Sequence, residues 1–143
     1  MRQAVVLFAH GARDPDWARP MWAICERCRL SMPEVEVRLA FLEFMTPTLA
    51  QAVAELYRQG ARAIRIVPLF LAQGGHLKRD LPLLIEALRL DHPGTELTLD
   101  RAIGESLLVQ DAIAAQICHA VAGSHADATV SCAEQHDSDH TPS

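Results

Sequence analysis

Short apolar runs alternate with segments of helical period along the chain. Runs rich in Val, Ile, Leu and Phe predict β-strands at residues 3–9, 35–41, 63–70 and, from a weaker run, 95–100. Apolar positions three and four residues apart predict helices at residues 17–31, 47–59, 81–90 and 105–122. This alternation predicts an α/β flavodoxin-like three-layer sandwich, in which helices cover both faces of a four-stranded parallel sheet of order 2-1-3-4.

Capping residues mark several of the predicted helix ends. Thr46 before Pro47 is typical of an N-cap followed by the first helical residue, and Asp80 before Leu81 and Pro82 suggests a second N-cap. Gly60 is typical of a helix C-terminus. Pro20 is expected to delay the first helix to its own vicinity.

Two histidines follow predicted strands within glycine-bearing loops. His10 and Gly11 come after the first strand, and Gly74, Gly75 and His76 come after the third. Strands 1 and 3 are neighbours in the predicted order, so both imidazoles can reach one point beyond the carboxyl edge, where ligands bind in such sheets. The three glycines permit close approach by a ligand.

A pair of neutral imidazoles is typical of a site for Co²⁺, Ni²⁺, Fe²⁺ or Zn²⁺. Two protein ligands leave the coordination sphere open, as expected where the metal is used or handed on. The alternative is that each histidine caps a helix or binds a backbone carbonyl.

Charged residues accompany the histidines at the predicted edge. Glu43 follows strand 2 in an apolar stretch that would favour its protonated form and suit it to proton exchange; the alternative is a solvated loop acid. Arg13, Lys78 and Arg79 could hold the carboxylates of an anionic ligand, or they could be ordinary surface charges.

Composition limits the classes of function. The 143 residues suit one soluble domain, with 13 Lys and Arg against 18 Asp and Glu and a net charge of −5. Residues 124–143 hold four of the acids and three His, so residues 1–123 are nearly neutral and lack the basic excess of a nucleic-acid binder. No apolar run is expected to span a membrane and the start lacks signal-peptide features, which predicts a cytoplasmic protein.

The remaining chemistry-bearing residues leave alternatives open. Cys25 and Cys28 have C-x-x-C spacing but lie on the apolar stripe of a predicted helix, so they are either core cysteines or a functional redox or metal pair. The polar segment 124–143 is expected to be a disordered tail after a domain of residues 1–123; it could capture metal through four scattered residues, His125, Cys132, His136 and His140. No dinucleotide, P-loop or G-x-S-x-G motif is present.

Three segments together resemble a known family. VVLFAHGARDP, FLEFMTPTL and VPLFLAQGGHLKRDLP are similar to the small CbiX/SirB-type sirohydrochlorin chelatases of tetrapyrrole biosynthesis, over residues 3–122. The chain departs from the common pattern at Ala12, where Ser is frequent. The resemblance implies insertion of Co²⁺ or Fe²⁺ into sirohydrochlorin without ATP or any cofactor besides the substrate metal. It also implies that His10 and His76 serve as metal ligands or proton acceptors, with Glu43 as the accompanying acid.

Longer members of this family contain two copies of the unit, so the resemblance implies that a chain with one copy forms a homodimer. We expect cobalt insertion in cobalamin biosynthesis, with iron insertion for siroheme as the alternative. Two other classes remain open: a non-catalytic metal carrier that uses the histidines, the cysteine pair and the tail, and a phosphate- or nucleotide-binding regulator suggested by fold analogy alone.

Overall fold

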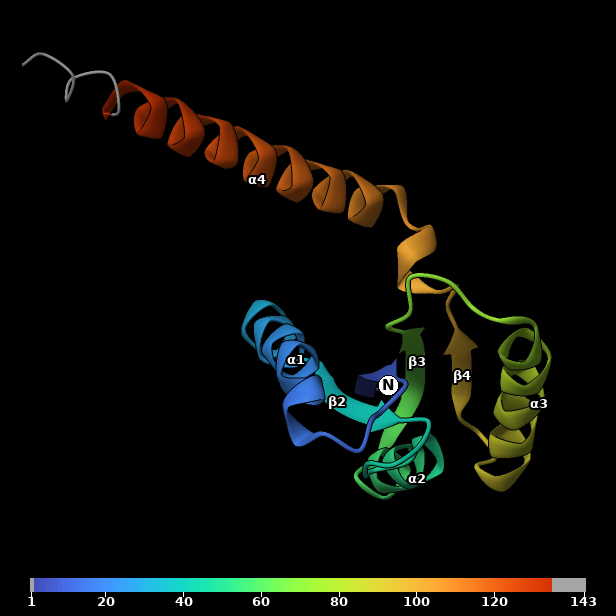
Figure 1. The fold of residues 1–143 in the computed structure, drawn as a ribbon. Coiled ribbons are helices and arrows are strands. Elements are labelled where there is room, and N and C mark those ends of the chain that lie inside the picture. The colour runs from blue at the N-terminus through green and yellow to red at the C-terminus, as the bar shows by residue number, and fades with distance from the viewer. Residues whose placement is uncertain (1, 135–143) are drawn as a thin grey trace, which may run out of the picture. The chain divides into compact units, whose positions relative to one another are not determined.

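The computed structural model describes residues 2–134, with side chains up to residue 124, and it confirms the predicted sheet. Four strands lie in the order β2-β1-β3-β4, and all three pairings are parallel. The strands are β1 (Arg2–Ala9), β2 (Glu36–Phe41), β3 (Ala61–Pro68) and β4 (Glu96–Leu99). Because every strand runs in the same direction, all four carboxyl ends lie at one edge of the sheet (Figure 1).

Helices cover both faces of this sheet. On one side lies α1 (Arg19–Ser31), which follows the short 3₁₀ helix η1 (Pro15–Ala18), and on the other side lie α2 (Leu49–Arg58) and α3 (Gly75–Asp91), as Figure 1 shows. A second 3₁₀ helix, η2 (Ile103–Glu105), follows β4.

Side chains of β1 alternate between two cores. Val6 and Phe8 belong to the cluster formed with α2 and α3, whereas Leu7 and Ala9 belong to the cluster formed with α1. All four are buried, as expected for a central strand covered on both faces. Burial of each large apolar side chain stabilises the fold by roughly 1.5–3 kcal/mol, and this fixes the position of the loop that begins at His10.

The third helix begins six residues earlier than the sequence predicts. α3 starts at Gly75 with Gly74 as N-cap, so the expectation of an N-cap at Asp80 is wrong. The reason lies in the apolar stripe, because Leu77 already packs against the core four residues before the buried Leu81. Pro82 lies on the exposed side and is accommodated inside the helix. His76, Lys78 and Arg79 therefore belong to the first turns of a helix, and not to a loop.

The other helix ends agree more closely with the prediction. α2 is capped by Thr48, two residues after the expected Thr46, because Thr48 and Gln51 form a reciprocal capping box. Gly60 follows the helix at φ +97°, which confirms it as the stop. Pro20 lies in the first turn of α1, also as predicted.

Within the described residues, a second unit begins at Ser106 and contains α4 (Leu107–Glu134). This helix is longer than the predicted segment 105–122, consistent with the high helix propensity of its many alanines. The expectation that no segment could span a membrane is wrong by length and composition, because Leu107–Ser124 has a mean hydropathy of 1.2 over 18 residues. Length and hydropathy alone do not identify a membrane span, because core helices of soluble proteins can be equally long and apolar. The side chains of His125 and Cys132, and all of His136 and His140, lie outside the part described.

Candidate functional site

The loops after β1 and β2 are tied together by their backbones. The Leu42 N–H donates to the Ala9 carbonyl at 2.9 Å, and the Glu43 N–H donates to the His10 carbonyl at 3.0 Å. Gly11 has φ +85°, and a Cβ added there would overlap the carbonyl oxygen of Glu43. Glycine at this position therefore lets the two loops touch, and it places the His10 and Glu43 backbones side by side.

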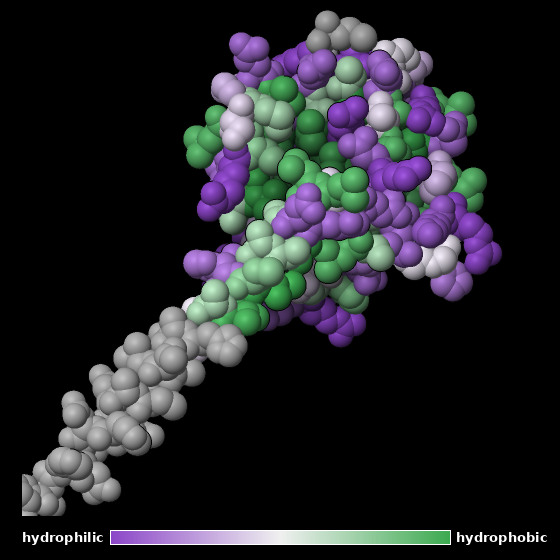
Figure 2. Space-filling view, turned by 90° about the horizontal axis from the view of Figure 1, so that it is seen from above, coloured by the Kyte–Doolittle hydropathy of each residue, from purple (hydrophilic) through white to green (hydrophobic). Residues whose placement is uncertain are grey.

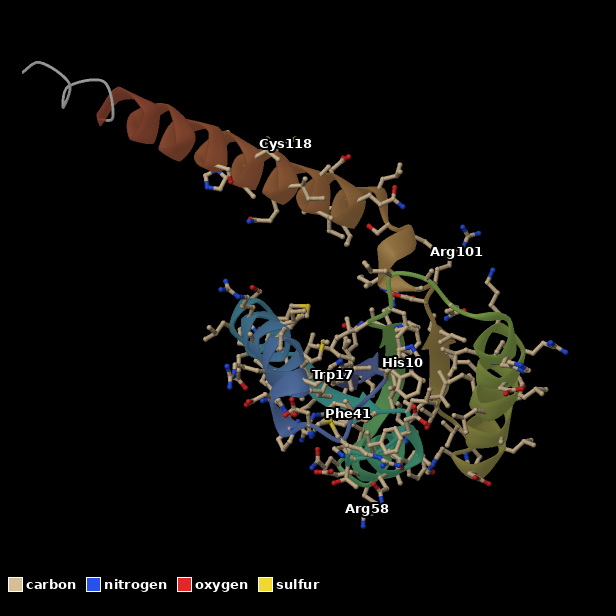
Figure 3. All side chains as sticks on the ribbon, in the orientation of Figure 1. His10, Trp17, Phe41, Arg58, Arg101 and Cys118 are labelled. Carbon is tan, nitrogen blue, oxygen red and sulfur yellow. The ribbon has the colours of Figure 1, made fainter. Side chains whose placement is uncertain are left out.

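The loop after β3 reaches the same place. The Leu69 N–H donates to the Phe8 carbonyl at 2.8 Å, so β3 continues alongside β1 past the end of the sheet. The ring of Phe70 then lies 4.4 Å from the His10 ring, centroid to centroid. Phe70 is buried, whereas the His10 side chain is exposed at the carboxyl edge (Figure 3). A buried aromatic thus supports one side of an imidazole that is otherwise open to solvent.

His76 is the second residue of α3, and its side chain is exposed. It enters from β3, the neighbour of β1, so both predicted histidines lie on the carboxyl side of the sheet. No set of three His, Cys, Asp or Glu side chains that could hold a metal ion occurs among the residues the structure describes. Glu43 therefore does not complete a preassembled three-ligand site with the two histidines.

Glu43 is exposed, which agrees with the alternative of a solvated loop acid and not with apolar surroundings for this residue. Its neighbours Leu42 and Phe44 are also exposed, at 39% and 58%. The sequence misled because an apolar run after a strand need not be buried where the chain turns over the sheet edge. A solvated carboxylate at this edge remains close in the chain to the backbone contact with His10.

The predicted basic residues are exposed and open to a ligand. Arg13, Lys78 and Arg79 form no ion pair with any residue that the structure describes. The guanidinium carbon of Arg13 lies 4.9 Å from the centroid of the Phe44 ring. Arg101 is a further exposed cation that the sequence analysis missed, and it forms no ion pair with the part of the chain that the structure describes (Figure 3). Its position directly after the predicted fourth strand was the available signal, since every loop at this edge is a candidate for ligand binding.

Gly74 and Gly75 place no side chain at the start of α3. A Cβ added at Gly74 or Gly75 would meet no atom within 4 Å, so neither glycine is required by packing. Figure 2 shows hydrophobic and hydrophilic side chains next to one another on the face of residues 2–105 that is seen from above.

The C-x-x-C pair has the character of core cysteines. Cys25 is fully buried in the cluster beneath α1, and Cys28 packs partly buried against it. Burial raises the pKa of the Cys25 thiol, so this group is poorly suited to act as a thiolate nucleophile or metal ligand. The interpretation as core cysteines is confirmed for Cys25.

The fold and its edge define a flavodoxin-like α/β protein that presents two imidazoles beyond neighbouring parallel strands. The comparison with protein families gives the same result: residues 4–120 match the CbiX family. The chain belongs to the CbiX family.

Relatives and solved structures of this family are similar over most of the same region. A sirohydrochlorin cobaltochelatase of Methanocaldococcus jannaschii is 39% identical over 92 residues, which are 63% of either chain. A sirohydrochlorin ferrochelatase of Priestia megaterium is 30% identical over 89% of this chain and 48% of its own length. The chain thus spans less than two thirds of the length of the first relative and about half the length of the second.

Among solved structures, a CbiX protein of cobalamin (vitamin B12) biosynthesis from Marinobacter aquaeolei has a TM-score of 0.74 at 30% identity, covering 83% of this chain and 97% of its own. The sirohydrochlorin chelatase SirB of Bacillus subtilis in complex with cobalt has a TM-score of 0.72 at 27% identity, and the match covers 83% of this chain and 51% of SirB. Both confirm the predicted chelatase-like fold.

Proposed function

We propose that this protein is a sirohydrochlorin chelatase that inserts a divalent metal, Co²⁺ in preference, into the macrocycle. The observation that carries the proposal is the placement of His10 and His76 as exposed imidazoles beyond two paired parallel strands. Relatives named sirohydrochlorin cobaltochelatase support the substrate and the metal. In the reaction, M²⁺ replaces two pyrrole N–H protons, so one metal ion enters and two protons leave.

The histidines supply the two functions that this exchange requires. Neutral imidazole binds Co²⁺ or Fe²⁺ and also accepts protons near pH 7. His10, supported against Phe70, presents its ring to the edge, and His76 approaches from the first turn of α3. Two ligands leave coordination positions for the pyrrole nitrogens. The exposed carboxylate of Glu43 is in a position to pass the released protons to water.

The unpaired cations suit the carboxylate groups of the substrate. Arg13, Lys78 and Arg79 can pair with acetate and propionate groups around the ring. The first turn of α3, left bare by Gly74 and Gly75, offers unpaired backbone N–H groups to the same carboxylates. Gly11 lets the loop that carries His10 touch the loop that carries Glu43. No cofactor besides the substrate metal is needed in this scheme.

We further propose that two copies pair as a homodimer in the cytoplasm, each edge facing a partner. The match to about half the length of SirB supports pairing, because the described residues contain one copy of the unit. Iron is the second candidate metal: the Priestia megaterium relative is a ferrochelatase, and a SirB structure contains Fe³⁺. A carrier that stores metal is less well supported, because the described residues hold no three-ligand cluster.

The experiment is an insertion assay with one preparation and three metals. Sirohydrochlorin is mixed with Co²⁺, Fe²⁺ or Ni²⁺, with and without protein, and the absorption change of the macrocycle is followed. The proposal predicts insertion well above the uncatalysed rate, fastest with Co²⁺. A rate equal to the protein-free control for all three metals would contradict chelatase function. It would favour the alternative of a non-catalytic metal carrier.

A further inference from the structure

Phe44 has a backbone conformation and an exposure that folding alone does not explain. Among the residues that the structure describes, Phe44 is the only non-glycine residue with a positive φ, at +64°. Glycine or asparagine normally occupies this left-handed region, which costs a bulky side chain on the order of 1 kcal/mol or more. The residue is nevertheless 58% exposed, so its side chain adds little to the hydrophobic core in return.

The position of Phe44 links it to the candidate site. It directly follows Glu43, whose N–H is hydrogen-bonded to the His10 carbonyl at 3.0 Å. The same stretch of loop lies against Gly11, where no Cβ could be accommodated. The Phe44 backbone is therefore anchored one residue from the contact between the loops that carry His10 and Glu43.

Arg13 holds the ring from one side. Its guanidinium carbon lies 4.9 Å from the centroid of the Phe44 ring, a cation–π geometry. Arg13 is itself exposed and forms no ion pair with the residues described. An aromatic face next to a free guanidinium combines a stacking surface with a carboxylate partner.

We propose that Phe44 is a positioning residue that stacks on the macrocycle beside His10, with Arg13 holding the ring in place and pairing with a peripheral carboxylate. This inference rests on the proposed chelatase function and adds a specific role for a residue that the motif does not assign. A flat conjugated ring bearing carboxylates is the ligand that uses both groups together. Strain that is kept at an exposed aromatic residue is consistent with a functional role for the ring.

The test compares Phe44→Gly and Phe44→Tyr with wild type. Glycine relieves the left-handed strain and removes the ring, whereas tyrosine keeps the ring. Four quantities are measured: the melting temperature, the Kd for metal-free sirohydrochlorin from its absorption change, and the KM and kcat for Co²⁺ insertion. Leu90→Ala is the control, because Leu90 is 84% exposed near the far end of α3 and lies outside the proposed site.

The proposal predicts that Phe44→Gly raises Kd and KM for sirohydrochlorin about tenfold, as expected for loss of one stacked ring and its buried area. Its kcat should change much less and its melting temperature should not fall, while Phe44→Tyr and Leu90→Ala should behave like wild type. Unchanged Kd and KM in Phe44→Gly would overturn the proposal. So would a fall in melting temperature and kcat at unchanged Kd, because this would indicate a structural role. If wild type itself neither binds sirohydrochlorin nor inserts metal, the proposed function fails, and the role of Phe44 fails with it.

Discussion

Substitution of Gly11 by alanine tests whether contact between the first two loops positions the site. Gly11 has φ +85°, and an added Cβ would overlap the Glu43 carbonyl oxygen. Gly60 is the matched control, because it has a similar φ of +97° but nothing within 4 Å of an added Cβ. Gly60→Ala therefore carries only the conformational cost, whereas Gly11→Ala must also separate the loops.

The expected magnitude follows from these contacts. Alanine at positive φ costs on the order of 1 kcal/mol. Separating the loops puts two backbone hydrogen bonds at risk, from Leu42 to Ala9 and from Glu43 to His10, at about 1 kcal/mol each. Gly11→Ala should thus lose about 3 kcal/mol in free energy of unfolding against about 1 kcal/mol for Gly60→Ala. For a unit of this size the difference corresponds to a melting temperature lower by roughly 10 °C.

The assay is thermal unfolding of both variants, followed by Co²⁺ insertion at a temperature where both are folded. Gly11→Ala should lose most of its insertion rate because His10 is displaced, and Gly60→Ala should keep the wild-type rate. Equal stabilities together with a wild-type rate in Gly11→Ala would refute the reasoning that this contact fixes the histidine.

Two further predictions concern pH and the cysteines. The hydrogen bond from Arg2, 2.6 Å long, holds the pKa of Glu36 below its usual value near 4.5. Glu36→Gln should therefore be less stable than wild type at pH 7, by at most about 1 kcal/mol for so exposed a pair. The difference should be complete above the unfolded pKa and should diminish as the pH falls through the lowered pKa of the folded protein, because the protonated carboxyl no longer favours the folded state. Urea unfolding at pH 7 and pH 3 checks it. Cys25→Ala should lower the melting temperature. Cys28→Ala should insert Co²⁺ at the wild-type rate. Loss of insertion in a folded Cys28→Ala protein would instead indicate that the two cysteines form a functional pair.

The sheet could be predicted from the sequence because each strand is a short apolar run between helical segments, and parallel crossovers leave few possible orders. The start of α3 was misplaced because Pro82 resembles a boundary, whereas the apolar stripe that begins at Leu77 governs the packing. Where a local capping signal and the burial of apolar side chains disagree, burial determines where the helix begins.

The candidate site was predictable where it depends on topology and not where it depends on loop conformation. The placement of His10 and His76 at one edge follows from the strand order. The exposure of Glu43 and the left-handed Phe44 depend on how one loop turns over that edge, which hydrophobicity does not encode. Arg101 could have been identified from the sequence alone, by the rule that every loop at the carboxyl edge is a candidate for ligand binding.

The central claim is that His10 and His76 act together on the metal, and the most direct test is the initial rate of Co²⁺ insertion into sirohydrochlorin by the His10→Ala/His76→Ala variant. Both side chains are exposed, so the variant should unfold at close to the wild-type temperature. The account predicts a rate indistinguishable from the protein-free reaction. A folded double variant that inserts Co²⁺ at a near-normal rate would contradict it.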